Sequence, residues 1–251
     1  MHDTNTRAVK PHVELIAYTP DPEKAVAVAA KLCYSDADIS GLYDGVSKSD
    51  VNKFIEMLVR LGHLSPIEHA SFTFALEGVS RALLAQITRH RVASFSVKSQ
   101  RYVGADKSFN YIIPPAVEAL GADAAERFHA QMEQARAWYL EWQALLGSGE
   151  RSNEDARFVL PNAAETKMIV TMNARELLHF FGLRCCNRAQ WEIREVAWRM
   201  LGEVIRVAPS LFKTAGPSCC GGVCSEGKMS CGNAEGVRAR HAKLLEGVKN
   251  L

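Results

Sequence analysis

Alternating and helical hydrophobic patterns divide most of the chain into strands and helices. Residues 12–18 and 69–76 alternate between apolar and polar positions, as half-buried strands do, and 165–172 form a third candidate strand. In the second of these, Phe72 and Phe74 point to one side. A period of about 3.6 residues predicts the helices, which we expect at 22–34, 50–61, 80–90, 122–146, 153–160, from 173 onward, at 188–207 and at 234–248.

Residues suited to helix ends mark several of these boundaries. Asp21 stands before Pro22, and Ser80 opens the predicted helix 80–90, where a side-chain oxygen can accept from free backbone N–H groups. Asn173, with Glu176 three residues later, resembles a capping box. We therefore expect a helix to begin directly after Asn173.

These elements predict an α+β fold, a single domain with long helices packed on a small antiparallel sheet. We expect this domain to span residues 1–215, followed by a Gly/Cys-rich tail with a short helix at 216–251. Trp138 and Trp142 lie four residues apart on the longest helix, and we expect them in the core. Helices with this much apolar surface favour an oligomer.

Composition and charge exclude several classes of protein. Hydrophobic residues make up 47% of the 251 residues, which is enough for a sizeable core. A formal charge of +2 argues against a general binder of nucleic acid or of anionic membranes. The first ten residues do not resemble a signal peptide, and no apolar run is long enough to span a bilayer. We therefore expect a cytoplasmic protein without nucleic-acid or membrane partners.

Several common cofactor and catalytic motifs do not occur in the sequence. There is no GxGxxG, no P-loop, no HExxH and no GxSxG, so a bound dinucleotide would not be held by a Rossmann fingerprint. None of the eight histidines are spaced three or four apart, which argues against a zinc hydrolase.

Four of the seven cysteines, Cys219, Cys220, Cys224 and Cys231, crowd into the tail. Reduced thiols are the first interpretation in a reducing compartment, and a zinc site or a disulfide remains an alternative. The spacing lacks paired CxxC knuckles, so we predict no metal site and no catalytic role for the tail.

The strongest chemical signal is Arg89-His90-Arg91, followed by seven residues and then Ser99. Arginine forks suit phosphates and rings rich in carbonyl groups, and clustered cations are costly unless an anion meets them. Gln86 is expected to share a helical face with Arg89 and His90. The alternative interpretation of these three residues alone is a solvated basic helix end.

This RHR-x7-S pattern resembles the signature of the flavin-dependent thymidylate synthases. Further segments similar to that family occur in the same order and together cover roughly residues 60–195. They are Gly62-His63-x-Ser65-Pro66-x-Glu68-His69, Gln100-Arg101-Tyr102, Ala156-Arg157-x-Val159-Leu160-Pro161, Asn173-Ala174-Arg175, Leu183-Arg184 and Ala189-Gln190-Trp191-Glu192.

The resemblance implies a homotetrameric FAD enzyme with shared active sites. Such an enzyme makes dTMP from dUMP, with methylenetetrahydrofolate as the one-carbon donor and NADPH as the reductant. It implies FAD contacts for Ser65, Arg89, His90, Arg91, Asn173, Arg175 and His179. It implies dUMP contacts for Gln86, Arg89, Ser99, Gln100, Arg101, Arg157 and Arg184, with Arg157 reaching in from a neighbouring subunit.

Arg184 is the implied catalytic residue. Carbon 5 of uracil is a weak nucleophile that becomes usable when negative charge builds on the ring, and a cationic donor stabilises that charge. Ser99 is assigned to binding, with a nucleophilic role as the alternative. The sequence departs from the family pattern at Val97-Lys98, where some relatives have an acidic or amide side chain, and at His179, which is asparagine in some.

Three rival functions compete with this one. A small metal-binding interaction protein built on the cysteine tail would leave the motifs of residues 60–195 unexplained. The cysteine-dependent class of thymidylate synthases needs a cysteine followed by histidine, and the sequence has none. An RNA-binding module that uses the Arg/His cluster is disfavoured by the near-neutral net charge.

Overall fold

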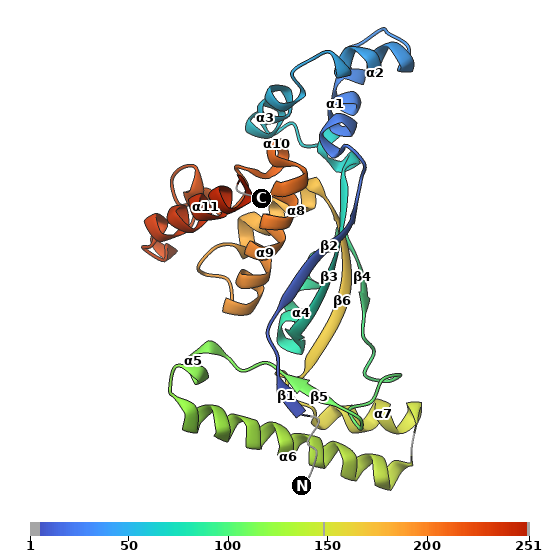
Figure 1. The fold of residues 1–251 in the computed structure, drawn as a ribbon, viewed down its shortest axis with the longest axis vertical. Helices are drawn as coiled ribbons and strands as arrows, with labels where there is room; N and C mark the ends of the chain where they lie inside the picture. Colours follow the sequence, from blue (N-terminus) through green and yellow to red (C-terminus); the bar gives the residue numbers. More distant parts are fainter. Residues whose placement is uncertain (1–5, 148, 250–251) are drawn as a thin grey trace. The chain divides into compact units, whose positions relative to one another are not determined.

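The structure, a computed structural model, describes residues 6–147 and 149–249 (Figure 1). Its strands are β1 (Thr6–Ala8), β2 (His12–Tyr18), β3 (Ser71–Ser80), β4 (Ala93–Val97), β5 (Phe109–Tyr111) and β6 (Glu165–Asn173). Its helices are α1 (Pro22–Leu32), α2 (Ile39–Ser47), α3 (Val51–Leu61), α4 (Arg81–Ile87), α5 (Pro115–Glu118), α6 (Ala122–Leu146), α7 (Glu150–Ala156), α8 (Ala174–Arg184), α9 (Trp191–Val207), α10 (Pro209–Phe212) and α11 (Ala234–Lys249). Short 3-10 turns are η1 (Pro66–His69), η2 (Arg157–Val159), η3 (Ser218–Cys220) and η4 (Gly227–Met229).

The sheet confirms the predicted α+β class. Four strands lie in the order β2-β3-β6-β4. The hydroxyls of Thr73 and Thr171 meet at 2.9 Å, and Lys167 bonds Glu77 at 2.8 Å, so β3 and β6 run antiparallel. A separate parallel pair, which the sequence did not predict, joins β1 to β5 with Thr6 opposite Phe109.

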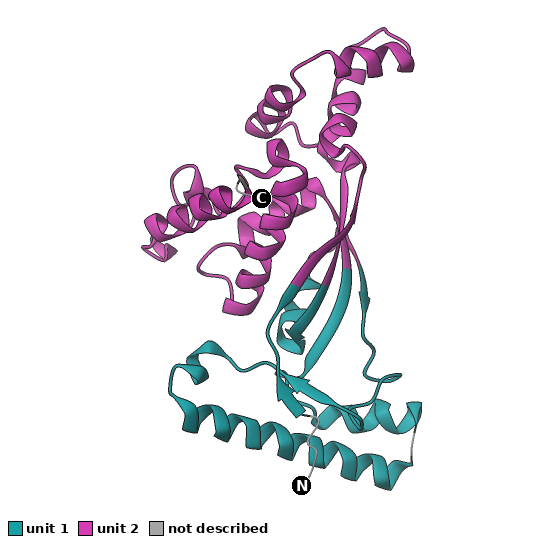
Figure 2. Ribbon diagram, in the orientation of Figure 1, with its two compact units in different colours: residues 1–12, 76–89, 95–169 teal, residues 13–75, 90–94, 170–251 magenta. Residues whose placement is uncertain are grey.

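The chain divides into two compact units (Figure 2). Unit 1 comprises residues 1–12, 76–89 and 95–169, and unit 2 comprises 13–75, 90–94 and 170–251. Each strand of the four-stranded sheet has residues in both units. The expected division between a domain ending at 215 and a tail beginning at 216 stays a prediction.

The core of unit 1 forms where α6 packs against β1 and η2. Met132, Ala135 and Tyr139 are the buried residues of α6, and they contribute to a cluster with Phe109 and Tyr111.

The tryptophans of α6 do not lie in that core. Trp138 is 51% exposed and Trp142 47%, so the prediction that both are core residues is wrong for this chain alone. The helix instead buries the side that carries Tyr139, and the indole rings of the two tryptophans are not on that buried side.

Four phenylalanine side chains in successive contact form part of the core of unit 2. Phe72 of β3 meets Phe212 of α10 with ring centres 5.3 Å apart, and Phe212 meets Phe181 of α8 at 6.0 Å. Phe181 in turn lies 5.7 Å from Phe180. All four are fully buried, and each such pair contributes about 0.5–1.5 kcal/mol beyond area burial. The sheet is thereby tied to α8, which carries much of the candidate site.

Side-chain caps confirm two of the three predicted helix starts. The Ser80 hydroxyl accepts from the N–H of Leu83 at 3.0 Å, and the Asn173 side chain accepts from the N–H of Glu176 at 2.9 Å. Asp21 makes no capping hydrogen bond, because its backbone is left-handed with φ 44°. The helix it precedes begins at Pro22 as predicted.

The helix predicted at 80–90 ends three residues early. Its last residue is Ile87, and the Thr88 hydroxyl donates back to the carbonyl of Leu84 at 2.8 Å. Arg89 and His90 therefore lie beyond the helix, and they do not share the helical face predicted for them with Gln86. This early end leaves His90 buried between an exposed Arg89 and an exposed Arg91.

The C-terminal segment is part of unit 2, and side-chain contacts join it to the rest of that unit. Arg188 forms an ion pair with Glu226, and Arg238 donates to the carbonyl of Cys219 at 3.2 Å. The seven cysteines are free thiols. Within residues 6–147 and 149–249, no group of three or more His, Cys, Asp or Glu side chains is placed to hold a metal ion. In the same ranges, no helix has the length and apolar character needed to cross a membrane.

Gly78 provides a test of the backbone conformation of β3. Its φ is +64°, and a Cβ there would lie 2.1 Å from the carbonyl oxygen of Lys10. We expect Gly78→Ala to lower the free energy of unfolding by more than about 1 kcal/mol, measured by urea denaturation. Gly45→Ala is the matched control, since a Cβ at that helical position meets nothing within 4 Å and should stabilise by about 0.5–1 kcal/mol. Equal stabilities for the two variants would contradict the strained geometry at Gly78.

Candidate active site

A buried histidine in unit 2 joins a carboxylate to an arginine. His90 is 5% exposed, and its Nδ1 lies 2.8 Å from Oε1 of Glu176. Its Nε2 accepts a hydrogen bond from Nε of Arg184 at 3.1 Å. An arginine nitrogen can only donate, so Nε2 carries the lone pair and Nδ1 carries the proton. His90 is thus held as one neutral tautomer that donates to Glu176.

The charge state of His90 follows from its surroundings. Burial lowers the pKa of His90, while its hydrogen bond with Glu176 opposes that shift. The positive charge of Arg184 and the neighbouring His179 lower the pKa further. The imidazole therefore stays neutral near pH 7, in the form that can accept from Arg184.

The sequence of α8 builds this arrangement through its helical spacing. Glu176, Phe180 and Arg184 are four residues apart, so they share one face of the helix over about 12 Å. The Phe180 ring lies 4.9 Å from the His90 ring, between the two hydrogen-bonding partners along that face. Glu176 stands in the first turn and Arg184 in the last, which are the ends that favour a negative and a positive charge.

A cavity of about 1000 Å³ opens elsewhere in unit 2. Its apolar wall comes from α1, α2 and α3 and includes Phe54 and Met57. Its polar lining includes His63, Ser65 and Arg175. Ligand sites of drug size occupy about 300–1000 Å³ and combine apolar walls with a few polar groups, and this cavity has both features.

Two contacts join the polar side of this cavity to the start of α8. The N–H of Ala174 donates to the carbonyl of Ala70 at 2.8 Å, which ties η1 to the helix. Arg175 forms an ion pair with Glu68 at 2.5 Å. The Ser65 segment and Arg175 are therefore held beside the same cavity.

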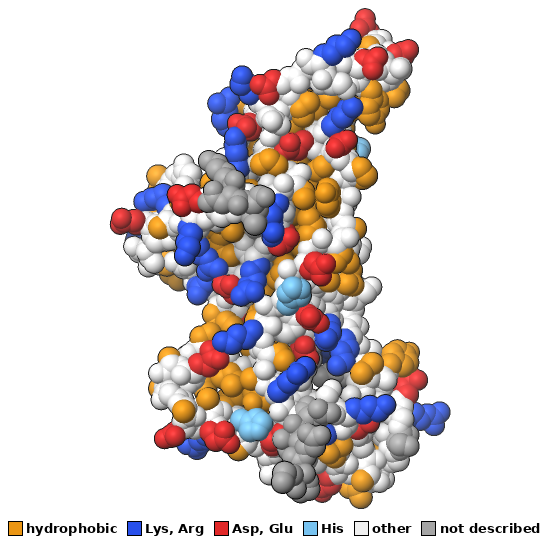
Figure 3. Space-filling view, in the orientation of Figure 1, with side chains coloured by type: hydrophobic (Ala, Val, Ile, Leu, Met, Phe, Trp, Pro, Cys, Tyr) orange, Lys and Arg blue, Asp and Glu red, His pale blue; other side chains and the backbone are white. Residues whose placement is uncertain are grey.

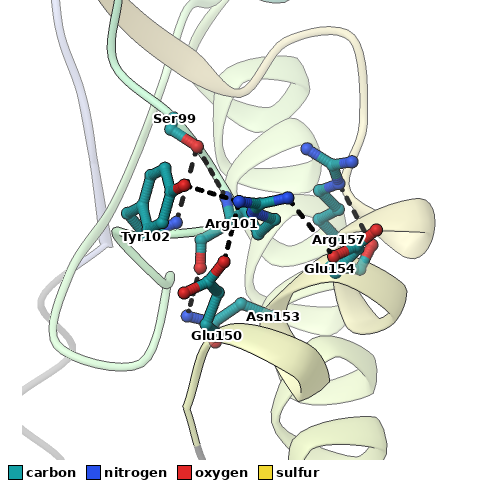
Figure 4. Close-up of polar contacts among 7 residues, drawn as sticks. All are labelled: Ser99, Arg101, Tyr102, Glu150, Asn153, Glu154 and Arg157. Atoms are coloured by element: carbon teal, nitrogen blue, oxygen red, sulfur yellow. Dashed lines mark hydrogen bonds and ion pairs between the residues drawn. The ribbon is translucent and has the colours of Figure 1, made fainter.

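In unit 1, a second cluster surrounds the turn that follows β4 (Figure 4). The Ser99 hydroxyl accepts from the N–H of Arg101 at 3.2 Å and of Tyr102 at 3.5 Å. Buried Asn153 of α7 donates to the carbonyl of Arg101 at 2.9 Å. The Arg101 guanidinium lies 2.8 Å from Glu150 and 3.8 Å from Glu154. The turn is thus fixed by α7, and the charge of Arg101 is balanced inside unit 1.

Arg81 is a half-buried cation of unit 1 whose pKa is influenced by Arg157. Burial lowers the pKa of Arg81, and the positive charge of Arg157 lowers it further. Arg157 also donates from Nε to the carbonyl of Glu154 at 3.0 Å.

The residues predicted from the sequence divide between the two units. Unit 2 holds Ser65, His90, Arg91, Asn173, Arg175, His179 and Arg184. Unit 1 holds Gln86, Arg89, Ser99, Gln100, Arg101 and Arg157. Most predicted flavin contacts thus fall in unit 2 and most predicted nucleotide contacts in unit 1. The roles of these residues stay predictions.

Within each unit the structure brings only some of these residues together. His90 contacts Arg184 and lies with its ring centre 6.0 Å from that of His179. The Asn173 amide oxygen caps α8. Glu176 was missed as a site residue, because the capping box offered a structural reason for its presence.

The distribution of charge on the face shown in Figure 3 does not mark a ligand site. On the face shown in Figure 3, Lys and Arg side chains are interspersed with Asp and Glu. This mixture fits the small formal charge of +2.

Comparison with known proteins identifies the class to which this fold and site belong. The family described as "Thymidylate synthase complementing protein" matches residues 14–210. The chain therefore belongs to this family, that of the flavin-dependent thymidylate synthases.

Individual relatives cover most of both chains. The protein named flavin-dependent thymidylate synthase from Clostridium tetani is 52% identical over 235 residues, 88% of this chain and 93% of its own. The protein of that name from Geobacter sulfurreducens is 52% identical over 227 residues, covering 90% and 96%. One from Sulfolobus acidocaldarius is 41% identical over 208 residues, covering 82% and 77%.

Proposed function

We propose that this protein catalyses the reductive methylation of dUMP to dTMP. Methylenetetrahydrofolate is the one-carbon donor and NADPH the reductant, and the reaction uses bound FAD. The observation that carries the proposal is 52% identity, over nearly the whole length of both chains, to relatives named flavin-dependent thymidylate synthase.

The chemistry of unit 2 fits a flavin. The cavity of about 1000 Å³ offers an apolar wall for a planar ring and polar groups for the rest of the cofactor. Ser65 and Arg175 line it, and we assign them to FAD together with Asn173, His179, Arg89 and Arg91. When bound, FAD supplies the redox chemistry, and the protein orients it.

Arg184 is the residue that we assign to the uracil ring. Its guanidinium carries a permanent charge and is directed by the hydrogen bond from its Nε to His90. A cation fixed beside the ring stabilises the negative charge that must build there before carbon 5 can attack. The nucleotide contacts proposed in unit 1 are Gln86, Ser99, Gln100, Arg101 and Arg157.

We also propose a homotetramer with active sites shared between subunits, located in the cytoplasm. The exposed Trp138 and Trp142 support an assembly, because large apolar side chains on one helix favour cover by another surface. Residues 1–215 are proposed to form the catalytic domain, with residues 216–251 as an appended tail.

The proposal is tested by supplying the purified chain with FAD, dUMP, methylenetetrahydrofolate and NADPH. We expect flavin absorption bands in the protein and formation of dTMP by chromatography. Arg184→Ala should lose about 100-fold or more in dTMP formation while still binding FAD, because one charge-stabilising donor is removed. Arg188→Ala, which removes an exposed arginine four residues later, is the matched control and should keep wild-type turnover. A colourless wild-type protein that does not bind added FAD would overturn the proposal.

Shared sites predict complementation between two inactive variants. If Arg157 serves the neighbouring subunit and Arg101 its own, a mixed oligomer of Arg157→Ala and Arg101→Ala chains contains some sites with neither change. We expect co-expression of the two variants to restore part of the activity that each lacks alone. Light scattering that shows an active monomer would contradict the shared site.

A further inference from the structure

Both ring nitrogens of His90 are engaged within unit 2. Nδ1 meets Glu176 at 2.8 Å and Nε2 meets Arg184 at 3.1 Å, while Phe180 packs against the ring. A family resemblance alone assigns this histidine to the flavin. The geometry instead gives its two polar atoms to side chains of α8.

The two partners select the same tautomer from opposite sides of the ring. A proton on Nε2 would face the Nε–H of Arg184, so two donors would meet without an acceptor. The Glu176 carboxylate requires a donor, which is available only when Nδ1 is protonated. Glu176 therefore determines which nitrogen of His90 is left to accept from Arg184.

Glu176 is placed for this task by the cap of α8. Its backbone N–H bonds the side chain of Asn173, which fixes the first turn of the helix. Its carboxylate turns toward His90, and its side chain is only 11% exposed. A carboxylate removed from water in this way is stable when it is paired with a good donor, which His90 provides.

We propose that Glu176 is a positioning residue for Arg184. Through the Nδ1–H of His90 it holds the imidazole in the tautomer that accepts from Arg184, and so it orients the guanidinium assigned to the uracil ring. This proposal rests on the proposed function for its effect on turnover, but its effect on His90 can be measured without any substrate.

The charged and titratable groups around His90 influence the pH at which its imidazole becomes protonated. Those that face it are Glu176, Arg184 and His179, all from α8. Burial lowers the pKa of His90, so protonation is expected only as the pH falls below the ordinary value of 6.5. A second proton would occupy Nε2 and break the bond from Arg184. Turnover should therefore fall on the acid side in the wild type.

Removal of the Glu176 carboxylate lowers the pKa of His90 further, because the hydrogen bond and the charge of Glu176 both raise that pKa. The fall in turnover at acid pH, which follows from protonation of His90, should accordingly occur at lower pH in Glu176→Gln. The amide oxygen of this variant still accepts from Nδ1–H, so turnover at neutral pH should stay within a few-fold of the wild type.

Glu176→Leu leaves Nδ1–H without an acceptor and frees the ring to change tautomer. We expect kcat to fall by about tenfold or more, the effect typical of losing a residue that orients a catalytic group, with a smaller change in KM for dUMP. The control is Glu195→Leu, which removes a more exposed carboxylate of unit 2 that pairs with Arg199 and Arg240. It should leave kcat unchanged.

The direct readout is the 15N spectrum of the histidine rings in labelled protein, with His90→Gln used to assign the signals. In the wild type, His90 should show a protonated Nδ1 and a bare Nε2. In Glu176→Leu the two nitrogens should move toward the opposite tautomer or an average of both, and in Glu195→Leu they should not move.

Two results would overturn the proposal. One is a wild-type His90 spectrum in folded Glu176→Leu, and the other is full turnover in that variant despite an altered spectrum. Circular dichroism identifies a variant that fails to fold, and Glu176→Gln then supplies the tautomer and pH measurements. If the wild type forms no dTMP, the proposed function fails, while the spectra still decide whether Glu176 sets the tautomer of His90.

Discussion

The hydrogen bond between the buried His90 and Arg184 determines where the single cation assigned to catalysis can point. Arginine is long and flexible, and a guanidinium held only by solvent would sample many directions. Here the acceptor is a neutral imidazole, so this hydrogen bond orients Arg184 without placing a negative charge on its Nε. Glu176 contacts the other ring nitrogen of His90. A guanidinium directed in this way suits the stabilisation of an anionic transition state.

The orientation of Arg184 depends on side-chain packing that begins in the sheet. Phe72 on β3 contacts Phe212, Phe212 contacts Phe181, and Phe180 beside it contacts the His90 ring. Side chains in such a core occupy defined rotamers, so the position of α8 relative to β3 is fixed to within small tolerances. The turn after β4 is held differently. Buried Asn153 and the Ser99 hydroxyl hold its backbone by hydrogen bonds, and its charged side chains remain at the surface of unit 1.

The parts of the structure predictable from sequence are those with long regular patterns or strong local chemistry. The 25-residue helix α6 was predicted at its observed bounds, and the caps Ser80 and Asn173 were confirmed because capping depends on neighbouring backbone atoms only. The short strands β1, β4 and β5 were missed, since three to five residues carry too little periodicity. The partnership of Glu176 with His90 spans 86 positions in the chain, and no local pattern encodes it. The exposure of Trp138 was missed for a similar reason, because periodicity reports an apolar residue but not whether a partner surface lies within the same chain.

Two of the arginines proposed to meet ligands, one in each unit, share one further feature. Arg175 is paired with Glu68, and Arg101 with Glu150, in contacts whose side chains are 38–52% exposed. Exposed ion pairs of this kind contribute only about 0–1 kcal/mol, so a ligand that displaces the carboxylate loses little stability. The pairing nevertheless restricts each guanidinium to a narrow set of positions before the ligand arrives. A phosphate can then form a bidentate contact with an arginine that is already oriented, and it gains the stronger interaction without the full entropic cost of ordering the side chain. Weak pairing at the surface and firm positioning in the core are therefore complementary, because the first allows exchange of ligands and the second keeps Arg184 in place during the chemistry.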